Sequence, residues 1–380
     1  MNLIGKILAG IAIGILLGLY APEDFVYIAI AAKSFIEQFI FFIVPLIILL
    51  FITSGIANLH GESTRILSTT VILAYVSTIL AAFLACNVAI KMIPFLISGD
   101  TVELSRDEST GSIIPLEIKP IMDVISALVL AFIMGIGIKY TRATTLKKIA
   151  DEGLNIIQLL ISNIIIPILP FYIAGVFLEI AWQGEVFTTL GHFALVLMMA
   201  VALHWIWLFV LYTAAGYYTS RNATEALKTM LPAYVTALGT MSSAATIPVT
   251  LKQTRANGVS ENVADFTIPL CATIHLCGSA ITITVCSVAV LAILNSGDVP
   301  SIFSMIPFIL LLGVIMVAAP GVPGGAVMAA LGLLETTLGF NGNALAIMIA
   351  LYVAQDSFGT ACNVAGDGAI AIIVDKIEKS

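Results

Sequence analysis

Four polar residues near the C-terminus, Asp356, Thr360, Asn363 and Asp367, are spaced to bind a charged ligand together. On a helix that turns about 100° per residue, each of the other three lies within about 40° of Asp356. If the apolar segment 343–375 spans a membrane, each isolated carboxylate costs several kcal/mol. Two carboxylates on one stripe are therefore expected to line a cavity, where they meet cations or an ammonium group. A network that only joins helices is the alternative interpretation.

A second polar run, Ala272 to Ser279, interrupts the apolar segment 261–294 and predicts an unwound helix centre. Carbonyl groups freed by unwinding can coordinate a hard cation, and the N-terminus of a half-helix favours a carboxylate. His275 lies within this run. It is interpreted either as a buried, hydrogen-bonded histidine or as a proton carrier.

The composition places both polar runs in a membrane protein. The chain has 380 residues, of which 60% are hydrophobic and 10% charged, whereas soluble domains carry about a quarter charged residues. The first apolar run is expected to be a transmembrane helix rather than a signal peptide. Six segments are each expected to span as a helix, and four more are apolar but interrupted: 3–20, 26–59, 66–97, 113–140, 153–182 and 187–218, then 226–251, 261–294, 302–335 and 343–375.

Other classes of function lack their motifs. The sequence has no G-x-x-x-x-G-K-[ST] loop for ATP and no H-E-x-x-H zinc motif, so we expect neither an ATP-driven pump nor an enzyme. Gly366-Asp367-Gly368 departs from an intramembrane aspartyl protease motif, because Val364 stands where a glycine is required. No cofactor and no nucleic-acid partner are expected. The five cysteines lie in apolar stretches and are interpreted as packing residues.

The positions of the charges predict an orientation and two hairpins. Lysine and arginine gather at alternate connections and at the termini, which predicts that both termini are cytoplasmic. Lys228 and Lys252 flank segment 226–251 on the same predicted side, so this segment should enter the membrane and return, turning near 239–243. Segment 302–335 should do the same from outside, turning near 320–325. Paired broken segments of this kind indicate a substrate site at the bilayer midplane.

Four ordered motifs resemble the dicarboxylate/amino acid:cation symporters, the family of the glutamate transporters. Ser242–Thr250 resembles the serine-rich tip of the first hairpin, and Gly321–Ala326 that of the second. Pro269–Gly278 resembles the unwound centre, and Asp356–Asp367 the signature of the final helix. The resemblance is close in the C-terminal half and extends to the N-terminal half only through its pattern of spans.

This resemblance implies an architecture and an assembly. It implies an all-α polytopic membrane protein with a glutamate-transporter-like fold, two opposed re-entrant hairpins and two unwound transmembrane helices. Residues 1–218 would be mainly scaffold and trimerisation helices, some of them joining the transport part. Residues 219–380 would form the core transport domain, which moves as an elevator within a homotrimer in the cell membrane.

The resemblance also assigns roles to individual residues. Asp356 would bind the substrate ammonium, Asn363 and the backbone around Ser242 and Ser243 its α-carboxylate, and Thr360 would lie beside its side chain. The outer gate would be formed by Val322, Pro323 and Gly324. Sodium is the expected coupling cation. The residues that would hold it, through side chains and nearby carbonyl groups, are Asp367, Asn363, Cys271, Thr273, His275, Ser279 and Thr78.

Two departures from the family pattern bear on substrate and coupling. Members that carry acidic substrates place an arginine in the final helix or at the first hairpin tip, where this chain has Gly359 and Met241. A small neutral amino acid such as serine or threonine is therefore expected. His275 and Cys277 replace an asparagine and an aspartate of the unwound centre, so fewer sodium ions bind or a proton replaces one. An acidic amino acid or dicarboxylate symporter, possible proton coupling and a passive ion channel remain the alternatives.

Overall fold

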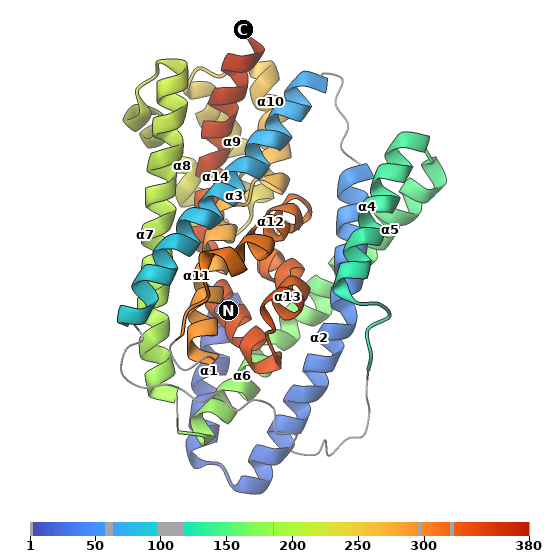
Figure 1. Ribbon diagram of the computed structural model, residues 1–380, viewed down its shortest axis with the longest axis vertical. Coiled ribbons are helices and arrows are strands. Elements are labelled where there is room, and N and C mark those ends of the chain that lie inside the picture. The colour runs from blue at the N-terminus through green and yellow to red at the C-terminus, as the bar shows by residue number, and fades with distance from the viewer. Residues whose placement is uncertain are drawn as a thin grey trace.

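The structure is a computed structural model that describes residues 3–57, 64–96, 118–184, 186–294, 298–319 and 323–379. Every regular element within these ranges is a helix, which confirms the all-α prediction. The elements labelled in Figure 1 are α1 (Leu3–Tyr20), α2 (Glu23–Ala57), α3 (Thr64–Leu96), α4 (Val124–Thr141), α5 (Thr144–Leu160), η1 (Ile161–Ile165), α6 (Ile166–Trp182), α7 (Val186–Thr219), α8 (Ala223–Thr240), α9 (Ser243–Ala256), α10 (Glu261–Ile274), α11 (Cys277–Leu294), α12 (Ile302–Ala318), α13 (Gly325–Leu338) and α14 (Gly342–Glu378).

Six of the expected segments contain candidate membrane spans, whereas the apolar parts of 3–20 and 113–140 are shorter helices in the described residues, Gly5–Tyr20 and Val129–Thr141. In the described residues, six stretches are long and apolar enough to cross a membrane: Glu23–Ala57, Arg65–Leu96, Thr144–Trp182, Gly191–Thr219, Glu261–Leu294 and Gly342–Glu378. The segment expected at 113–140 is a helix only from Val124, and residues 113–117 lie outside the described residues. The segment expected to begin at 153 begins at Thr144, because a more polar, amphipathic stretch precedes the apolar part.

A π-helical turn, η1, joins α5 to α6 within one continuous stretch. Pro167 and Pro170 follow it closely. Proline has no backbone N–H and crowds the preceding turn, so a wider turn just before these two residues accommodates them without ending the helix. The sequence analysis did not anticipate this turn.

The helices pack in two groups; in Figure 1, α2, α4 and α5 lie on the right, α1 and the labelled part of α6 lie at the lower end, and α3, α7, α8 and α14 lie on the left. The helix α1 packs against α6, and α2 packs against α4, α5 and α6. The helices α11 and α14 form the buried centre of the other group, where α3, α7 and α8 pack against them. The helices α3 and α7 therefore pack with the C-terminal half although they precede residue 219. The division into a scaffold and a transport domain stays a prediction.

Hydrogen bonds from a buried lysine and a buried tyrosine join the two groups. Lys33 of α2 is 6% exposed, and its Nζ lies 2.7 Å from Glu179 Oε2 of α6 and 2.7 Å from Asn343 Oδ1 at the start of α14. Tyr172 of α6 donates a hydrogen bond of 3.0 Å to the Gly342 carbonyl oxygen. A lysine this deeply buried requires such partners, because unpaired charge is costly at low dielectric.

The first predicted hairpin is present as α8 and α9. The chain turns at Met241, a left-handed residue (φ 53°) that ends α8, and Ser242 Oγ then accepts a hydrogen bond of 3.3 Å from Ala245 N to begin α9. Both ends of the hairpin meet Asp375, near the end of α14. Arg221 Nη2 lies 3.6 Å from Asp375 Oδ2, and Ser260 Oγ donates to Asp375 Oδ1 at 2.6 Å. The hairpin therefore returns to the end of the molecule from which it started.

The second hairpin consists of α12 and α13 and lies at the opposite end. It follows Leu294, the last residue of α11, and precedes Gly342, the first residue of α14. Because α10 begins beside Asp375 and α14 ends there, Leu294 and Gly342 both lie at the far end of the bundle. The turn includes residues 320–322, which lie outside the described residues, and α13 begins after Gly324, whose φ is 74°. The two hairpins are therefore opposed, as the charges predict.

One of the two expected unwound helices is interrupted, and the other is continuous. The helix α10 ends at Ile274, His275 is extended (φ −109°, ψ 86°), and α11 begins at Cys277. The final helix, in contrast, runs unbroken from Gly342 to Glu378, so the expectation of a second unwound helix is wrong. This helix contains no proline, and its glycines remain helical because neighbouring helices pack tightly on that face.

Candidate functional site

The polar stripe of α14 lies at the centre of the protein. Asp356, Thr360, Asn363 and Asp367 are all buried, with exposed fractions of 5% or less. Each makes a hydrogen bond, to the second hairpin, to the break between α10 and α11, or within the stripe itself. The continuous helix α14 thus positions four polar groups against the two places where backbone groups leave regular helix.

Asp356 holds the tip of the second hairpin. Its Oδ2 accepts a hydrogen bond of 2.7 Å from the backbone N–H of Gly324, the residue immediately before α13. Thr360 Oγ1 donates a longer bond of 3.4 Å to Asp356 Oδ1. The carboxylate therefore lies at the positive N-terminal end of α13, where a negative charge is favoured. Pro323 is half-buried beside this contact, and Val322 lies outside the described residues.

Asn363 holds the second half of the broken helix. Its Oδ1 accepts from the backbone N–H groups of Gly278 at 2.7 Å and Ser279 at 3.3 Å, which are among the unpaired amides at the start of α11. Its Nδ2 donates to Ser279 Oγ at 3.1 Å, and Tyr352 Oη donates to the same oxygen at 2.9 Å. The asparagine thus caps α11 across the helix interface.

Asp367 pairs with the histidine of the break. Asp367 Oδ1 lies 2.9 Å from His275 Nδ1, and the other ring nitrogen, Nε2, lies 2.8 Å from Ser77 Oγ of α3. Both His275 and Asp367 are at most 1% exposed. The imidazole ring therefore links α3, the broken helix and α14. Its Nδ1 atom is in direct contact with the Asp367 carboxylate. Ser77 is a contact that the sequence analysis missed, because it selected the adjacent Thr78.

Among the other predicted cation ligands, Thr273 is exposed and the rest are buried. Thr78 and Cys271 are buried, and Thr78 Oγ1 has no hydrogen-bond partner in the described part of the chain. Thr273 is exposed and donates its hydroxyl hydrogen to the Leu270 carbonyl oxygen at 2.8 Å. The described residues hold no group of three or more histidine, cysteine, aspartate or glutamate side chains that could bind a metal ion. A cation here would therefore rely on Asp367 with hydroxyl, amide and carbonyl oxygens.

Comparison with known proteins identifies the class of protein that carries this arrangement. A sequence model of the Sodium:dicarboxylate symporter family matches residues 3–377. The chain belongs to this family. A serine/threonine transporter, SstT, of Acinetobacter baylyi is 26% identical over 400 residues, covering 100% of this chain and 98% of that protein. The serine/threonine transporter SstT of Acinetobacter baumannii strain AYE is 26% identical over 403 residues, covering 99% and 96%.

Family membership confirms the general predictions made from the sequence. This protein is a multi-pass membrane protein and a symporter active in amino-acid transport, and it is not an enzyme. It therefore carries a small substrate while embedded in a lipid bilayer. The polar stripe of α14 places two buried carboxylates beside the N-terminus of α13 and the break between α10 and α11.

Gly359 and Met241 stand where acidic-substrate members of the family place an arginine, and the two positions lie in different surroundings. Gly359 of α14 faces α11: a methyl group at this position would lie 3.6 Å from Gly278 C, Ser279 N and Thr282 Oγ1. Met241 ends α8 at the first hairpin turn and is 9% exposed. Ser242 caps α9 at this turn, and Ser243 is buried next to it. Neither position supplies a positive charge to the site.

Two residues of α7 that the sequence analysis did not select support the site of this symporter. His204 Nε2 lies 3.0 Å from the Gly278 carbonyl oxygen and 3.1 Å from Thr282 Oγ1. Tyr212 Oη donates to the Ala365 carbonyl oxygen at 2.7 Å. Both lie in an apolar span, and the sequence alone does not distinguish residues that contact the α14 stripe and the break from ordinary buried side chains.

Proposed function

We propose that this symporter carries a small neutral amino acid, with serine and threonine as the first candidates. We also propose that sodium drives the transport of this substrate. The observation that carries the proposal is Asp356, a buried carboxylate at the tip of the second hairpin. A carboxylate in this position attracts the ammonium group that all amino acids share. The relatives from Acinetobacter are named serine/threonine transporters, which supports the same class of substrate.

The side chain of the substrate is inferred from the absence of a counter-charge. A second carboxylate on the substrate would require a partner such as an arginine, because a buried unpaired charge costs several kcal/mol. Gly359 and Met241 stand at the two positions where acidic-substrate members of the family place that arginine. Thr360 lies one turn from Asp356 and offers a hydroxyl group, which suits a hydroxyl-bearing side chain.

Sodium is assigned to the surroundings of Asp367. A carboxylate together with the Asn363 amide oxygen and backbone carbonyls is a suitable oxygen set for a hard cation. The family resemblance adds Thr78, whose buried hydroxyl group has no partner in the described residues. His275, however, already contacts Asp367 at 2.9 Å. We infer that fewer sodium ions bind than in relatives with an asparagine and an aspartate in the break; a protonated His275 in place of one cation is the competing proposal.

The proposed cycle depends on the contact between Gly324 and Asp356. Closure of the second hairpin over a loaded site places the N-terminus of α13 on the carboxylate, and an empty or half-loaded site would close less readily. Residues 219–380 would move with the substrate past a scaffold formed mainly by residues 1–218, within a homotrimer of the cell membrane. Both chain termini would face the cytoplasm.

The test is uptake into proteoliposomes that contain the purified protein. Labelled serine, threonine, alanine, aspartate and glutamate are compared under an imposed sodium gradient and, separately, a proton gradient. The proposal predicts uptake of serine or threonine that requires sodium. Preference for aspartate would overturn the argument from the missing arginine, and uptake driven by protons alone would transfer the coupling role to His275.

A further inference from the structure

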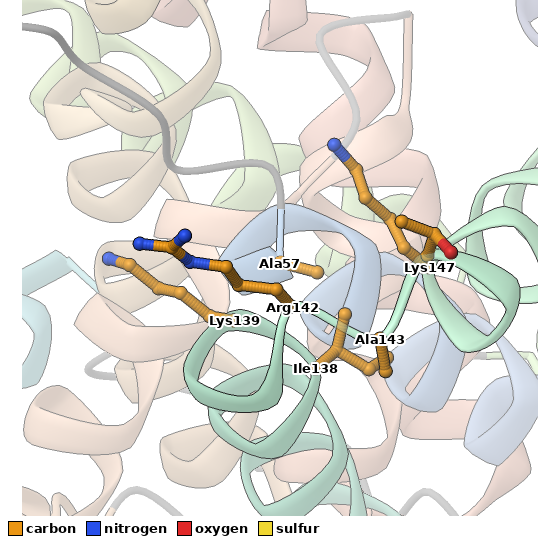
Figure 2. Close-up of a pocket in the computed structure, with 7 residues that line it drawn as sticks. Ala57, Ile138, Lys139, Arg142, Ala143 and Lys147 are labelled. Carbon is orange, nitrogen blue, oxygen red and sulfur yellow. The ribbon is translucent and has the colours of Figure 1, made fainter.

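A basic hollow lies at the junction of α4 and α5, and none of the stripe residues of α14 lines it. Its volume is about 430 Å³, and Figure 2 shows the side chains around it. Three of its lining residues are cationic and none is acidic: Ala57, Ile138, Lys139, Arg142, Ala143, Thr144 and Lys147. In the part of the chain that the structure describes, Lys139, Arg142 and Lys147 form no ion pair.

The fold holds the three cationic side chains around this hollow. Arg142 ends α4 in the left-handed conformation (φ 53°, ψ 37°), with its backbone N–H bonded to the Ile138 carbonyl oxygen. Ala143 N donates to the same oxygen at 3.2 Å, and α5 begins at the next residue. The chain therefore changes direction within two residues. This turn brings Lys139 from the last turn of α4 and Lys147 from the first turns of α5 to one place.

The start of α5 adds to the positive potential of the hollow. Ala143, the residue that precedes the helix, has no side chain that could accept a hydrogen bond from the first-turn amides. These uncapped amides and the helix dipole give the end of this 17-residue helix a partial positive charge. Thr144, which also lines the hollow, adds a hydroxyl group. Three side-chain cations and a helix N-terminus suit a phosphate group.

The surface beside the hollow indicates the source of that phosphate. On α4, the apolar side chains of Val129, Ile133 and Ile136 are 53%, 62% and 54% exposed on the single protomer. On α5, Ile149 is 58% exposed. Apolar surface ending at a basic pocket matches an amphiphile with acyl chains along the helices and an anionic headgroup at their end.

We propose that this hollow binds the phosphate group of an anionic phospholipid. The headgroup would contact Lys139, Arg142 and Lys147, and the acyl chains would lie against the apolar face of α4. The site would hold the α4–α5 junction at the level of the headgroups. It would act independently of the substrate, because it shares no residue with the proposed transport site.

Lipid binding to the purified full-length protein tests the proposal. Native mass spectrometry would measure the affinity for phosphatidylglycerol and for phosphatidylcholine. In the variant Lys139→Gln/Arg142→Gln/Lys147→Gln, affinity for phosphatidylglycerol should fall by about tenfold or more, since each cation near a headgroup contributes to binding. Affinity for phosphatidylcholine should stay the same.

A matched variant controls for net charge. Lys148→Gln/Lys228→Gln/Lys252→Gln removes three exposed lysines that do not line the hollow, and it should retain wild-type affinity for phosphatidylglycerol. An equal loss in both variants, or no loss in the first, would overturn the proposal. If the first variant does not fold, the single change Lys147→Gln should still weaken phosphatidylglycerol binding measurably.

Competition with inorganic phosphate distinguishes a lipid from a soluble ligand. A lipid site requires millimolar phosphate or more to displace phosphatidylglycerol, because the ion lacks the contacts of the acyl chains. Displacement at micromolar phosphate would mean that the hollow selects a soluble phosphate and that the assignment to a lipid is wrong.

Discussion

The close approach of α11 to α14 predicts that two neighbouring glycines respond in opposite ways to the same substitution. A methyl group at Gly278 would lie 2.7 Å from Cys362 Cβ and would also collide with the Gly359 carbonyl oxygen. Backbone atoms cannot move aside as a flexible side chain can. At Gly359, in contrast, the nearest atoms would be 3.6 Å away, which is an ordinary van der Waals contact.

The size of the effect follows from the packing. Overfilling a well-packed interior costs about 1–3 kcal/mol, so Gly278→Ala should lower the apparent melting temperature of this long chain by about 1–4 °C. Gly359→Ala adds the helix preference of alanine, about 0.5–1 kcal/mol, and should leave the melting temperature unchanged or slightly raised. Separation of α11 from α14 would also lengthen the 2.7 Å bond between Gly278 N and Asn363 Oδ1, so serine uptake by Gly278→Ala should fall.

Thermal unfolding of the purified variants in one detergent, together with uptake in proteoliposomes, provides the measurement. The matched substitution at Gly359 controls for the loss of a glycine in this part of the fold. If both variants melt with the wild type, the two helices do not approach as closely as described. If Gly359→Ala is the more damaging of the two, the assignment of the tight contact to Gly278 is wrong.

Three further predictions concern the buried charges. Asp356→Asn should weaken serine binding by about 30-fold or more in calorimetry, because loss of one partner from a buried charge pair costs at least about 2 kcal/mol; binding within threefold of wild type would contradict this. Asp367→Asn should raise the sodium concentration for half-maximal uptake by about tenfold, and an unchanged sodium curve would exclude it as a ligand. Lys33→Met should destabilise the protein by about 3–5 kcal/mol in denaturation, with partial recovery on adding Glu179→Gln; equal stability of the single and double variants would refute the pair.

The sequence predicted those features of the fold that membrane physics constrains strongly. Lys228 and Lys252 on one predicted side required a hairpin, and the contacts of Arg221 and Ser260 with Asp375 confirm that this segment returns to its starting end. The break at His275 was also predicted, because a polar run within an apolar span is costly unless it lines an interior.

Other features of the fold and of the candidate site could not be predicted from the sequence. The family resemblance implied a second unwound helix, but α14 contains no proline and stays continuous, with close neighbours filling the space beside its glycines. The contacts of Ser77, His204 and Tyr352 with residues 275–279 depend on which helices pack around the break, and residues so distant in sequence carry no local signal of this packing. Direct contact between His275 and Asp367 likewise emerged only with the structure.

The central claim, sodium-driven transport of a neutral amino acid through the α14 stripe, is tested most directly by uphill accumulation. Sealed proteoliposomes with an inward sodium gradient are given labelled serine, and the internal concentration is measured before and after an ionophore collapses the gradient. Our account predicts that serine accumulates above its external concentration, that the ionophore releases it, and that Asp367→Asn needs about tenfold more sodium for the same accumulation. Serine that only equilibrates across the membrane, with or without sodium, would contradict the account and identify a passive pathway.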